Sequence, residues 1–253
     1  MIKRMIGLLG LLGLVSGCFT SSVAPDPSIL RVGVSPDSRP IIFEQGGKIM
    51  GIEADFARKL GAELHRKIVF VKVPWDKQID YLEQNKTDII MSGMTITLPR
   101  SMRVEFCAPY LQSGMTGLFR RNSYNDAGLV SSVIINQGKK IGAIKDTTGE
   151  LFVIRNFPRS EKIYFSNADK AVEALKRGKI DMFIYDAPII WWLSAQNESS
   201  LVAFPELLNT EPLAWAVQKN NTKLRDQVNA ALLKWAKDGS RKKVVDRWIP
   251  LAR

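Results

Sequence analysis

The chain has 253 residues, 45% of them hydrophobic, and a formal net charge of +11. That length is enough to bury a core in one large domain or in two of roughly 100 residues each. Beyond the N-terminal region no apolar run approaches the ~20 residues that a membrane-spanning helix needs. The basic residues are scattered, with their densest cluster at 241–243, so they indicate a solvated surface rather than a nucleic-acid-binding patch.

The N-terminus is typical of an export signal. Two basic residues precede an apolar stretch, Met5–Val15, that is too short to span a membrane, and small residues follow it. This order predicts a signal peptide over 1–17. The sequence LVSGC also resembles the lipobox of bacterial lipoproteins, which implies that Cys18 becomes the lipidated first residue and that 18–28, rich in Ser and Pro, is a tether. An ordinary signal peptide with an incidental cysteine is the alternative.

Cysteine and histidine are too scarce for several kinds of chemistry. If Cys18 is lipidated, Cys107 has no disulfide partner, so stability has to come from the core. Together with the single His65 it offers no zinc-binding cluster and no nucleophile–base pair. No cofactor, metal or catalytic residue is therefore expected.

The first predicted elements are strands separated by a helix. Strands are expected at 29–34 and 67–73. Between them, 51–64 places apolar residues at helical spacing and predicts an amphipathic helix, with Ile52, Phe56, Leu60 and Leu64 on one face. The segment 222–239 shows the same periodicity and predicts a helix that stops at a glycine, with a short terminal helix after it.

Two later segments repeat each other. Residues 75–91 read as a helix, a turn and a strand, and residues 168–188 read in the same way. Six pairs of identical or similar residues lie 93 positions apart: Asp76/Asp169, Lys77/Lys170, Ile79/Val172, Leu82/Leu175, Lys86/Lys179 and Asp88/Asp181. The repeat predicts two α/β lobes, each with a mostly parallel sheet flanked by helices.

The two matched strands end in residues of opposite charge. In open α/β sheets, ligands collect beyond the carboxyl ends of the strands. There the first repeat supplies the hydroxyls of 92–97 and the guanidinium of Arg100, and the second supplies Asp186. Such a pair across a cleft suits a small zwitterion. The alternatives are a solvated loop arginine and an Asp186 that caps the helix expected from Ala187.

Four stretches in order resemble family 3 extracellular solute-binding proteins, the amino-acid receptors of ABC importers. They are DIIMSGMTIT with the arginine that follows, VEFCAPYLQSG, IDMFIYDAP and VNAALLKWAKDGSRKKVVDRW, within Ile29–Trp248. The resemblance implies a type II periplasmic-binding (Venus flytrap) fold. Its lobe 1 would be 29–110 with 213–253, its lobe 2 115–208, and its hinges would lie near 110–114 and 209–213. It further implies an exported monomer, anchored to the cell envelope, that binds an amino acid for a permease.

The same resemblance assigns roles to individual residues. Arg100 matches the arginine that binds the ligand α-carboxylate, and Asp186 matches the carboxylate that binds the α-ammonium. Supporting roles fall on a hydroxyl (Thr95), a backbone edge (Ser92 and Gly93), an aromatic wall (Trp75) and a helix N-terminus (Thr147 and Thr148). Ser35, Ser38 and Arg39 are candidates for contact with the ligand side chain.

The chain departs from the family pattern at several positions. Pro99 stands directly before Arg100, which is expected to restrict Leu98 to extended conformations. Asp146 replaces the usual glycine, either as a helix N-cap or at a cost to carboxylate binding.

The ligand side chain is predicted to be polar and uncharged, or acidic. Ser35 stands where receptors for basic amino acids often carry an acid, which leaves Asp37 or Glu53 to supply one. Arg39 favours an acidic or polar side chain.

Two other functions fit parts of the pattern. A ligand-sensing module without transport would keep the same pocket and change only the partner. Cyclohexadienyl dehydratases share this fold but carry a glutamate just after the Asp-Ala pair, where this chain has Pro188 and Ile189. An enzyme is therefore not expected.

Overall fold

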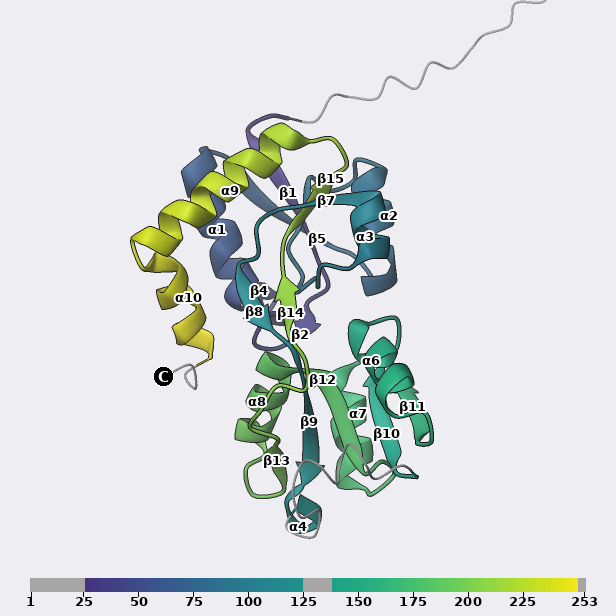
Figure 1. Cartoon of the computed structure of the whole chain (residues 1–253). Helices are drawn as coiled ribbons and strands as arrows, with labels where there is room; N and C mark the ends of the chain where they lie inside the picture. The colour runs from purple at the N-terminus through teal and green to yellow at the C-terminus, as the bar shows by residue number, and fades with distance from the viewer. Residues whose placement is uncertain (1–25, 125–137, 250–253) are drawn as a thin grey trace, which may run out of the picture.

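The computed structural model describes residues 26–124 and 138–249. It shows two α/β lobes, one above the other in Figure 1, which confirms the predicted fold class. The predicted signal peptide, Cys18 and the tether up to residue 25 lie outside the described residues. Within the described ranges, no helix is long and apolar enough to cross a membrane.

Lobe 1 contains a five-stranded sheet. Its order is β5 (Lys67–Lys72), β1 (Ile29–Val34), β6 (Ile89–Ile90), β15 (Ala216–Gln218) and β7 (Val104–Phe106). The first three strands run parallel, and β15 runs antiparallel to both of its neighbours. The predicted strands at 29–34 and 67–73 correspond to β1 and β5.

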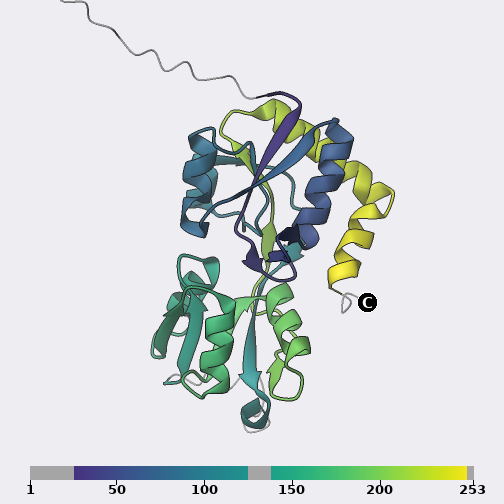
Figure 2. The same ribbon diagram turned by 180° about the vertical axis from the view of Figure 1, so that it is seen from behind.

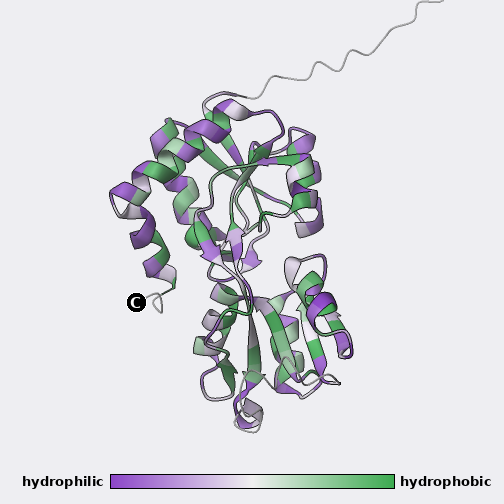
Figure 3. Ribbon diagram, viewed as in Figure 1, coloured by the Kyte–Doolittle hydropathy of each residue, from purple (hydrophilic) through white to green (hydrophobic). Residues whose placement is uncertain are grey.

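Lobe 2 repeats this topology. Its order is β11 (Glu161–Phe165), β10 (Lys140–Ile144), β12 (Met182–Asp186), β9 (Met115–Arg120) and β13 (Leu201–Ala203). Again three strands run parallel, and the fourth, β9, is antiparallel to both neighbours. Figure 3 shows hydrophobic residues along the strands, as expected for a sheet covered by helices.

Helices pack around both sheets (Figures 1 and 2). Those of lobe 1 are α1 (Ile52–Leu64), a 3₁₀ turn (Trp75–Lys77), α2 (Gln78–Glu83), α3 (Leu98–Arg103), α9 (Thr222–Lys237) and α10 (Ser240–Trp248). Those of lobe 2 are α4 (Arg121–Tyr124), α6 (Thr148–Asn156), α7 (Ala168–Lys176) and α8 (Ala187–Gln196). A small antiparallel sheet, β2 (Asp37–Ser38), β3 (Ile42–Gln45) and β4 (Lys48–Met50), completes lobe 1.

Two chain crossings join the lobes, and their strands pair with each other. β8 (Leu111–Ser113) leads into β9, and β14 (Glu211–Leu213) leads back into β15. The antiparallel strand of each sheet is therefore the direct continuation of a crossing strand. The crossings pack closely, because a Cβ on Gly114 would lie 2.0 Å from the backbone oxygen of Asn209. The Asn209 side chain also accepts a hydrogen bond from Met115 N–H at 2.6 Å.

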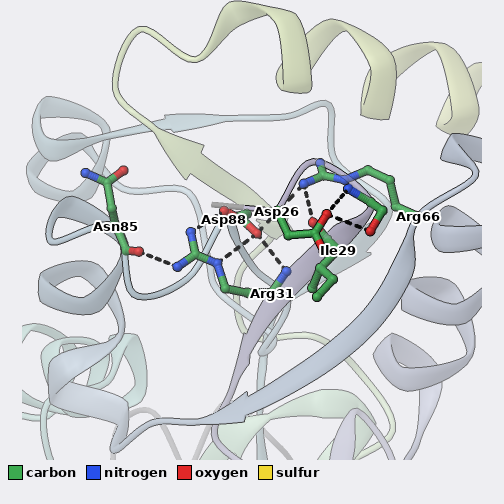
Figure 4. A network of polar contacts seen from close by, with 7 residues as sticks. Asp26, Ile29, Arg31, Arg66, Asn85 and Asp88 are labelled. Carbon is green, nitrogen blue, oxygen red and sulfur yellow. Dashed lines mark hydrogen bonds and ion pairs between the residues drawn. The ribbon is translucent and has the colours of Figure 1, made fainter. Parts of the chain in front are cut away.

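The structure explains the repeat of 93 residues. Asp88 accepts a hydrogen bond from the backbone N–H of Arg31 at 2.7 Å, and Asp181 accepts one from Lys140 at 2.9 Å. Each aspartate thus ties the start of its strand to the neighbouring parallel strand. In lobe 1 the Arg31 guanidinium also forks onto Asp88, with its shortest contact at 2.6 Å (Figure 4). The repeated acid is a scaffold residue at the sheet end away from the cleft.

Candidate functional site

A cavity lies between the lobes, and both lobes line it. Its lining is Asp37, Ser38, Ile41, Trp75, Ser92, Gly93, Thr95, Arg100, Ile144, Lys145, Thr147, Thr148, Ser166, Asn167, Ala168, Tyr185, Asp186, Ile189 and Leu213. Nine of the ten predicted ligand-binding residues are among them; Ser35 is the exception. The structure therefore brings together predicted residues that are up to 148 positions apart in sequence, from Ser38 to Asp186.

Arg100 enters the cavity from the first turn of α3. Thr97 caps this helix, its hydroxyl accepting the backbone N–H of Arg100 at 3.4 Å. The expectation that Leu98 is extended is wrong: Leu98 is the first residue of the helix, and Pro99 is tolerated in a first turn because the N–H it lacks has no intrahelical partner there.

The Arg100 guanidinium is only partly engaged by protein. One nitrogen donates to the backbone oxygen of Thr95 at 2.9 Å, and the group lies 5.3 Å from the centre of the Trp75 ring. Burial lowers the pKa of Arg100, and the negative charges of Asp186 and Glu211 oppose that shift. Because guanidinium pKa values lie so high, the group stays charged, with donors left to bind a carboxylate.

Asp186 ends β12 on the opposite lobe and is only 9% exposed. It stands at the N-cap position of α8, but its side chain makes no capping hydrogen bond, and its Oδ1 has no partner among the described residues. The capping alternative is therefore wrong. The pKa of Asp186 is raised to about 7, mainly by burial and also by the negative charge of Glu211, while the positive charge of Arg100 opposes the rise. A buried carboxylate oxygen that has no partner in the described parts of the chain points to a partner from outside the protein.

The N-terminus of α6 forms another wall in lobe 2. Thr147 is the N-cap, donating its hydroxyl hydrogen to the Ile144 carbonyl at 2.7 Å and accepting from Glu150 N–H at 3.4 Å. Thr148 follows, and its Oγ1 lies 3.5 Å from the Oγ1 of Thr95 across the cleft. Free N–H groups and the helix dipole make this end a suitable site for an anion.

Asp146 does not cap that helix, because Thr147 does. Its backbone has a φ of +61°, a conformation that glycine adopts without strain. Its N–H donates to the Glu150 carboxylate at 2.6 Å, and its carbonyl accepts from the Trp75 indole at 2.9 Å across the cleft. The Asp146 side chain is not part of the cavity lining.

Ser35 lies behind the cavity. Its backbone N–H donates to the Ser92 hydroxyl at 2.8 Å, and its own hydroxyl donates to the Val73 carbonyl at 2.9 Å. Gln78 donates to the same Ser35 hydroxyl at 2.9 Å. Ser35 thus supports Ser92 from behind, with its hydroxyl already satisfied by protein groups.

Two further acids lie near the site: Glu211, which the sequence did not indicate, and Glu53, which it offered only as a partner for a basic ligand side chain. Glu211, on the second crossing, accepts the Thr95 hydroxyl at 3.1 Å and an Asn209 amide N–H at 2.8 Å. Glu53 is fully buried beneath the cleft; burial raises its pKa to about 7, opposed by Tyr110, the Gly93 backbone N–H and Trp215. Glu211 lies far in sequence from the ends of the two matched strands, so no local pattern could have connected it to the site.

Comparison with known proteins identifies the family. Residues 30–250 match the family described as bacterial extracellular solute-binding proteins, family 3. The chain belongs to this family.

Relatives in the family agree with this membership. The ABC transporter glutamine-binding protein GlnH of Bacillus subtilis (strain 168) is 27% identical over 91% of this chain and 84% of that protein. The ABC transporter arginine-binding protein 1 of Escherichia coli (strain K12) is 28% identical over 87% and 90%. Both relatives are thus named as amino-acid-binding proteins of ABC transporters rather than as enzymes.

Solved structures share the fold of this family 3 chain. A putative ABC-transporter binding component from Wolinella succinogenes, complexed with lysine, has a TM-score of 0.84 and 30% identity over 88% of this chain and 96% of that one. The ancestral amino-acid-binding protein AncCDT-1, a precursor of cyclohexadienyl dehydratase, has a TM-score of 0.79 and 30% identity over 88% and 95%.

Proposed function

We propose that the chain binds one amino acid in the interlobe cavity and delivers it to the permease of an ABC importer. The Arg100 guanidinium and the N-terminus of α6 hold the α-carboxylate. Asp186 holds the α-ammonium, with the Thr95 hydroxyl and the backbone at Ser92 and Gly93 beside it. Trp75 packs against the ligand from lobe 1.

The observation that carries this proposal is a pair of incompletely satisfied charges. Arg100 comes from lobe 1 with donors left over, and Asp186 comes from lobe 2 with a buried oxygen that has no partner among the residues that the structure describes. A zwitterion satisfies both groups at once. Because each charge belongs to a different lobe, the bound ligand also ties the lobes together, as in hinge closure.

The lobe boundaries and hinges follow from this mechanism. Lobe 1 is 29–110 with 213–253 and lobe 2 is 115–208. The crossings near 110–114 and 209–213 would bend when the cleft opens. The antiparallel pairing of β8 with β14 supports this assignment, because two paired strands provide a defined axis for rotation.

The cellular setting is proposed from the sequence and the family. The family is extracellular. The signal-like segment 1–17 and the lipobox-like Cys18 support export and a lipid anchor on the cell envelope. The partner would be the permease of an importer, and the binding protein would act as a monomer.

The relatives differ in the side chain of the amino acid for which they are named. The relatives are named for glutamine, arginine, cystine and histidine. The sequence favoured a polar or acidic side chain, and the acidic half of that preference rested on Arg39. Arg39 does not line the cavity that holds the α-groups; it lines a neighbouring cavity, where its guanidinium lies over Phe43 at 4.5 Å. Polar side chains remain compatible with the lining, whereas the argument for an acidic one loses its support.

A thermal-shift screen against all amino acids tests the binding function. A ligand at 100 times its dissociation constant stabilises the folded state by about 2.7 kcal/mol, which raises the melting temperature measurably. The expected result is a rise with one amino acid or a small related group. A flat screen would contradict the proposal. ATP-dependent uptake by a reconstituted permease, with and without this protein, separates transport from ligand sensing alone.

A further inference from the structure

A second cavity continues from the ligand cavity toward solvent. This outer cavity, of about 380 Å³, is lined by Pro36, Asp37, Arg39, Phe43, Glu44, Asn167, Ala168, Asp169, Ile189, Trp192 and Leu193. Four residues, Asp37, Asn167, Ala168 and Ile189, line both cavities. An amino acid held by its α-groups in the inner cavity thus has room for a long side chain to pass Asp37 into the outer one.

Asp37 brings a negative charge to the junction of the two cavities. The Ser38 hydroxyl donates to its carboxylate at 3.1 Å. Across the described ranges, no Lys or Arg lies within 4.0 Å of that carboxylate. Glu53, the other acid that could have met a basic ligand, lines neither cavity. Of the two acids, Asp37 and Glu53, only Asp37 therefore has access to a ligand side chain.

A second carboxylate faces this junction from the other lobe. Asp169, in the first turn of α7, lines the outer cavity and forms no ion pair with any residue that the structure describes. Although solvent reaches Asp37, the surrounding cleft walls raise its pKa, and the negative charge of Asp169 raises it further. Two like charges from opposite lobes repel each other, so a cation between them would favour the closed cleft.

Three cations lie near the two cavities, and none of them pairs with Asp37. The Arg39 guanidinium lies 4.5 Å from the ring of Phe43 and 5.7 Å from that of Trp192. Lys72 pairs with Glu44 at 2.6 Å. Lys145 lines the inner cavity and is exposed. None of these three cations makes an ion pair with Asp37.

From these contacts we propose that the ligand is an amino acid with a positive charge at the end of a long side chain, and that Asp37 is the residue that selects this charge. This inference rests on the proposed amino-acid-binding function and names the ligand class of the same site. Asp169 adds to the negative potential from lobe 2. The positive charge of the side chain then pairs with Asp37, while the α-carboxylate pairs with Arg100 and the α-ammonium with Asp186.

Titration calorimetry with L-arginine and L-citrulline tests the inference. The two side chains have nearly the same shape, but citrulline carries a neutral urea group in place of the guanidinium. The wild-type protein is expected to bind arginine at least tenfold more tightly than citrulline. Asp37→Asn keeps the acceptor for Ser38 and removes the charge, so the ratio should fall toward one while citrulline binding changes less than threefold.

Asp226→Asn is the matched control, because Asp226 is an exposed acid on α9 and its loss changes the net charge by the same amount away from the cleft. That variant should keep the wild-type ratio. Tighter binding of citrulline, glutamine or glutamate than of arginine and lysine would overturn the inference and leave the proposed function standing. An unchanged ratio in Asp37→Asn would remove the role of Asp37. Binding of no amino acid at all would contradict the proposed function itself.

Discussion

The two lobes share a scaffold and differ in the chemistry that they bring to the cleft. Each has three parallel strands, an antiparallel fourth and an aspartate that accepts a hydrogen bond from the backbone of the neighbouring parallel strand. At the cleft, lobe 1 supplies a guanidinium and an aromatic ring, whereas lobe 2 supplies a carboxylate and a helix N-terminus. The repeat fixes where the strand ends point, and residues just beyond the repeat decide what they bind.

The largest expected effect comes from removing either half of the charge pair. Arg100→Ala and Asp186→Ala should each weaken amino-acid binding by roughly 2–5 kcal/mol, because each leaves a buried ligand charge without a partner. Titration calorimetry measures both. Wild-type affinity in either variant would mean that its lobe does not hold the ligand through that charge.

The repeated scaffold aspartates should differ between the lobes. Asp88→Ala removes a forked ion pair with Arg31 as well as a backbone hydrogen bond, and should lower the free energy of unfolding by about 2–3 kcal/mol. Asp181→Ala removes a backbone hydrogen bond and a longer 3.5 Å contact with Arg120, and should cost about 1 kcal/mol. Urea denaturation checks the order, and the reverse order would contradict this comparison of the two scaffolds.

Binding should depend on pH through Asp186. Its pKa in the unliganded protein is raised to about 7, and an α-ammonium binds the ionised form. Affinity should therefore fall as pH drops below 7, by up to about tenfold per unit. A carboxyl with a raised pKa also makes the free protein less stable as pH rises from about 4 to 7, and bound ligand should offset that loss. Calorimetry at pH 8, 7, 6 and 5.5 measures the slope, and Asp186→Asn should flatten it.

The smallest effects should come from the two threonine caps, one in each lobe. Thr97→Ala and Thr147→Ala each remove an N-cap hydrogen bond and should lower the free energy of unfolding by about 1 kcal/mol. Thr97→Ser and Thr147→Ser keep the hydroxyl and should keep the free energy of unfolding close to that of the wild-type protein. Thermal denaturation compares the Ala variant with the Ser variant at each position. Equal stability of the two would show that the cap hydrogen bond does not stabilise the fold.

Much of this architecture was predictable from sequence. Hydrophobic periodicity predicted β1, β5, α1 and α9, and the 93-residue repeat predicted a second lobe with the same helix–turn–strand unit. The strand ends then indicated Arg100 and Asp186, because the carboxyl ends of parallel strands share one edge of a sheet. These features depend on the local hydrophobic pattern and on the topology of a parallel sheet, and both can be inferred from the sequence.

Other parts depend on tertiary contacts that no local pattern encodes. The Thr97 cap outweighs the restriction that Pro99 places on Leu98. Ser35 stands at a strand end but turns to hydrogen bonds behind the cavity. Glu211 reaches Thr95 only because the second crossing passes beneath the cleft.

The most direct test of the central claim compares one amino acid with two of its derivatives. The best ligand from the screen is titrated alongside its α-carboxamide, which lacks the carboxylate, and its N-acetyl form, which lacks the ammonium. Both derivatives should bind at least a hundredfold more weakly, since Arg100 and Asp186 each lose their partner. If either derivative bound as tightly as the free amino acid, the two-lobe clamp on a zwitterion would be contradicted.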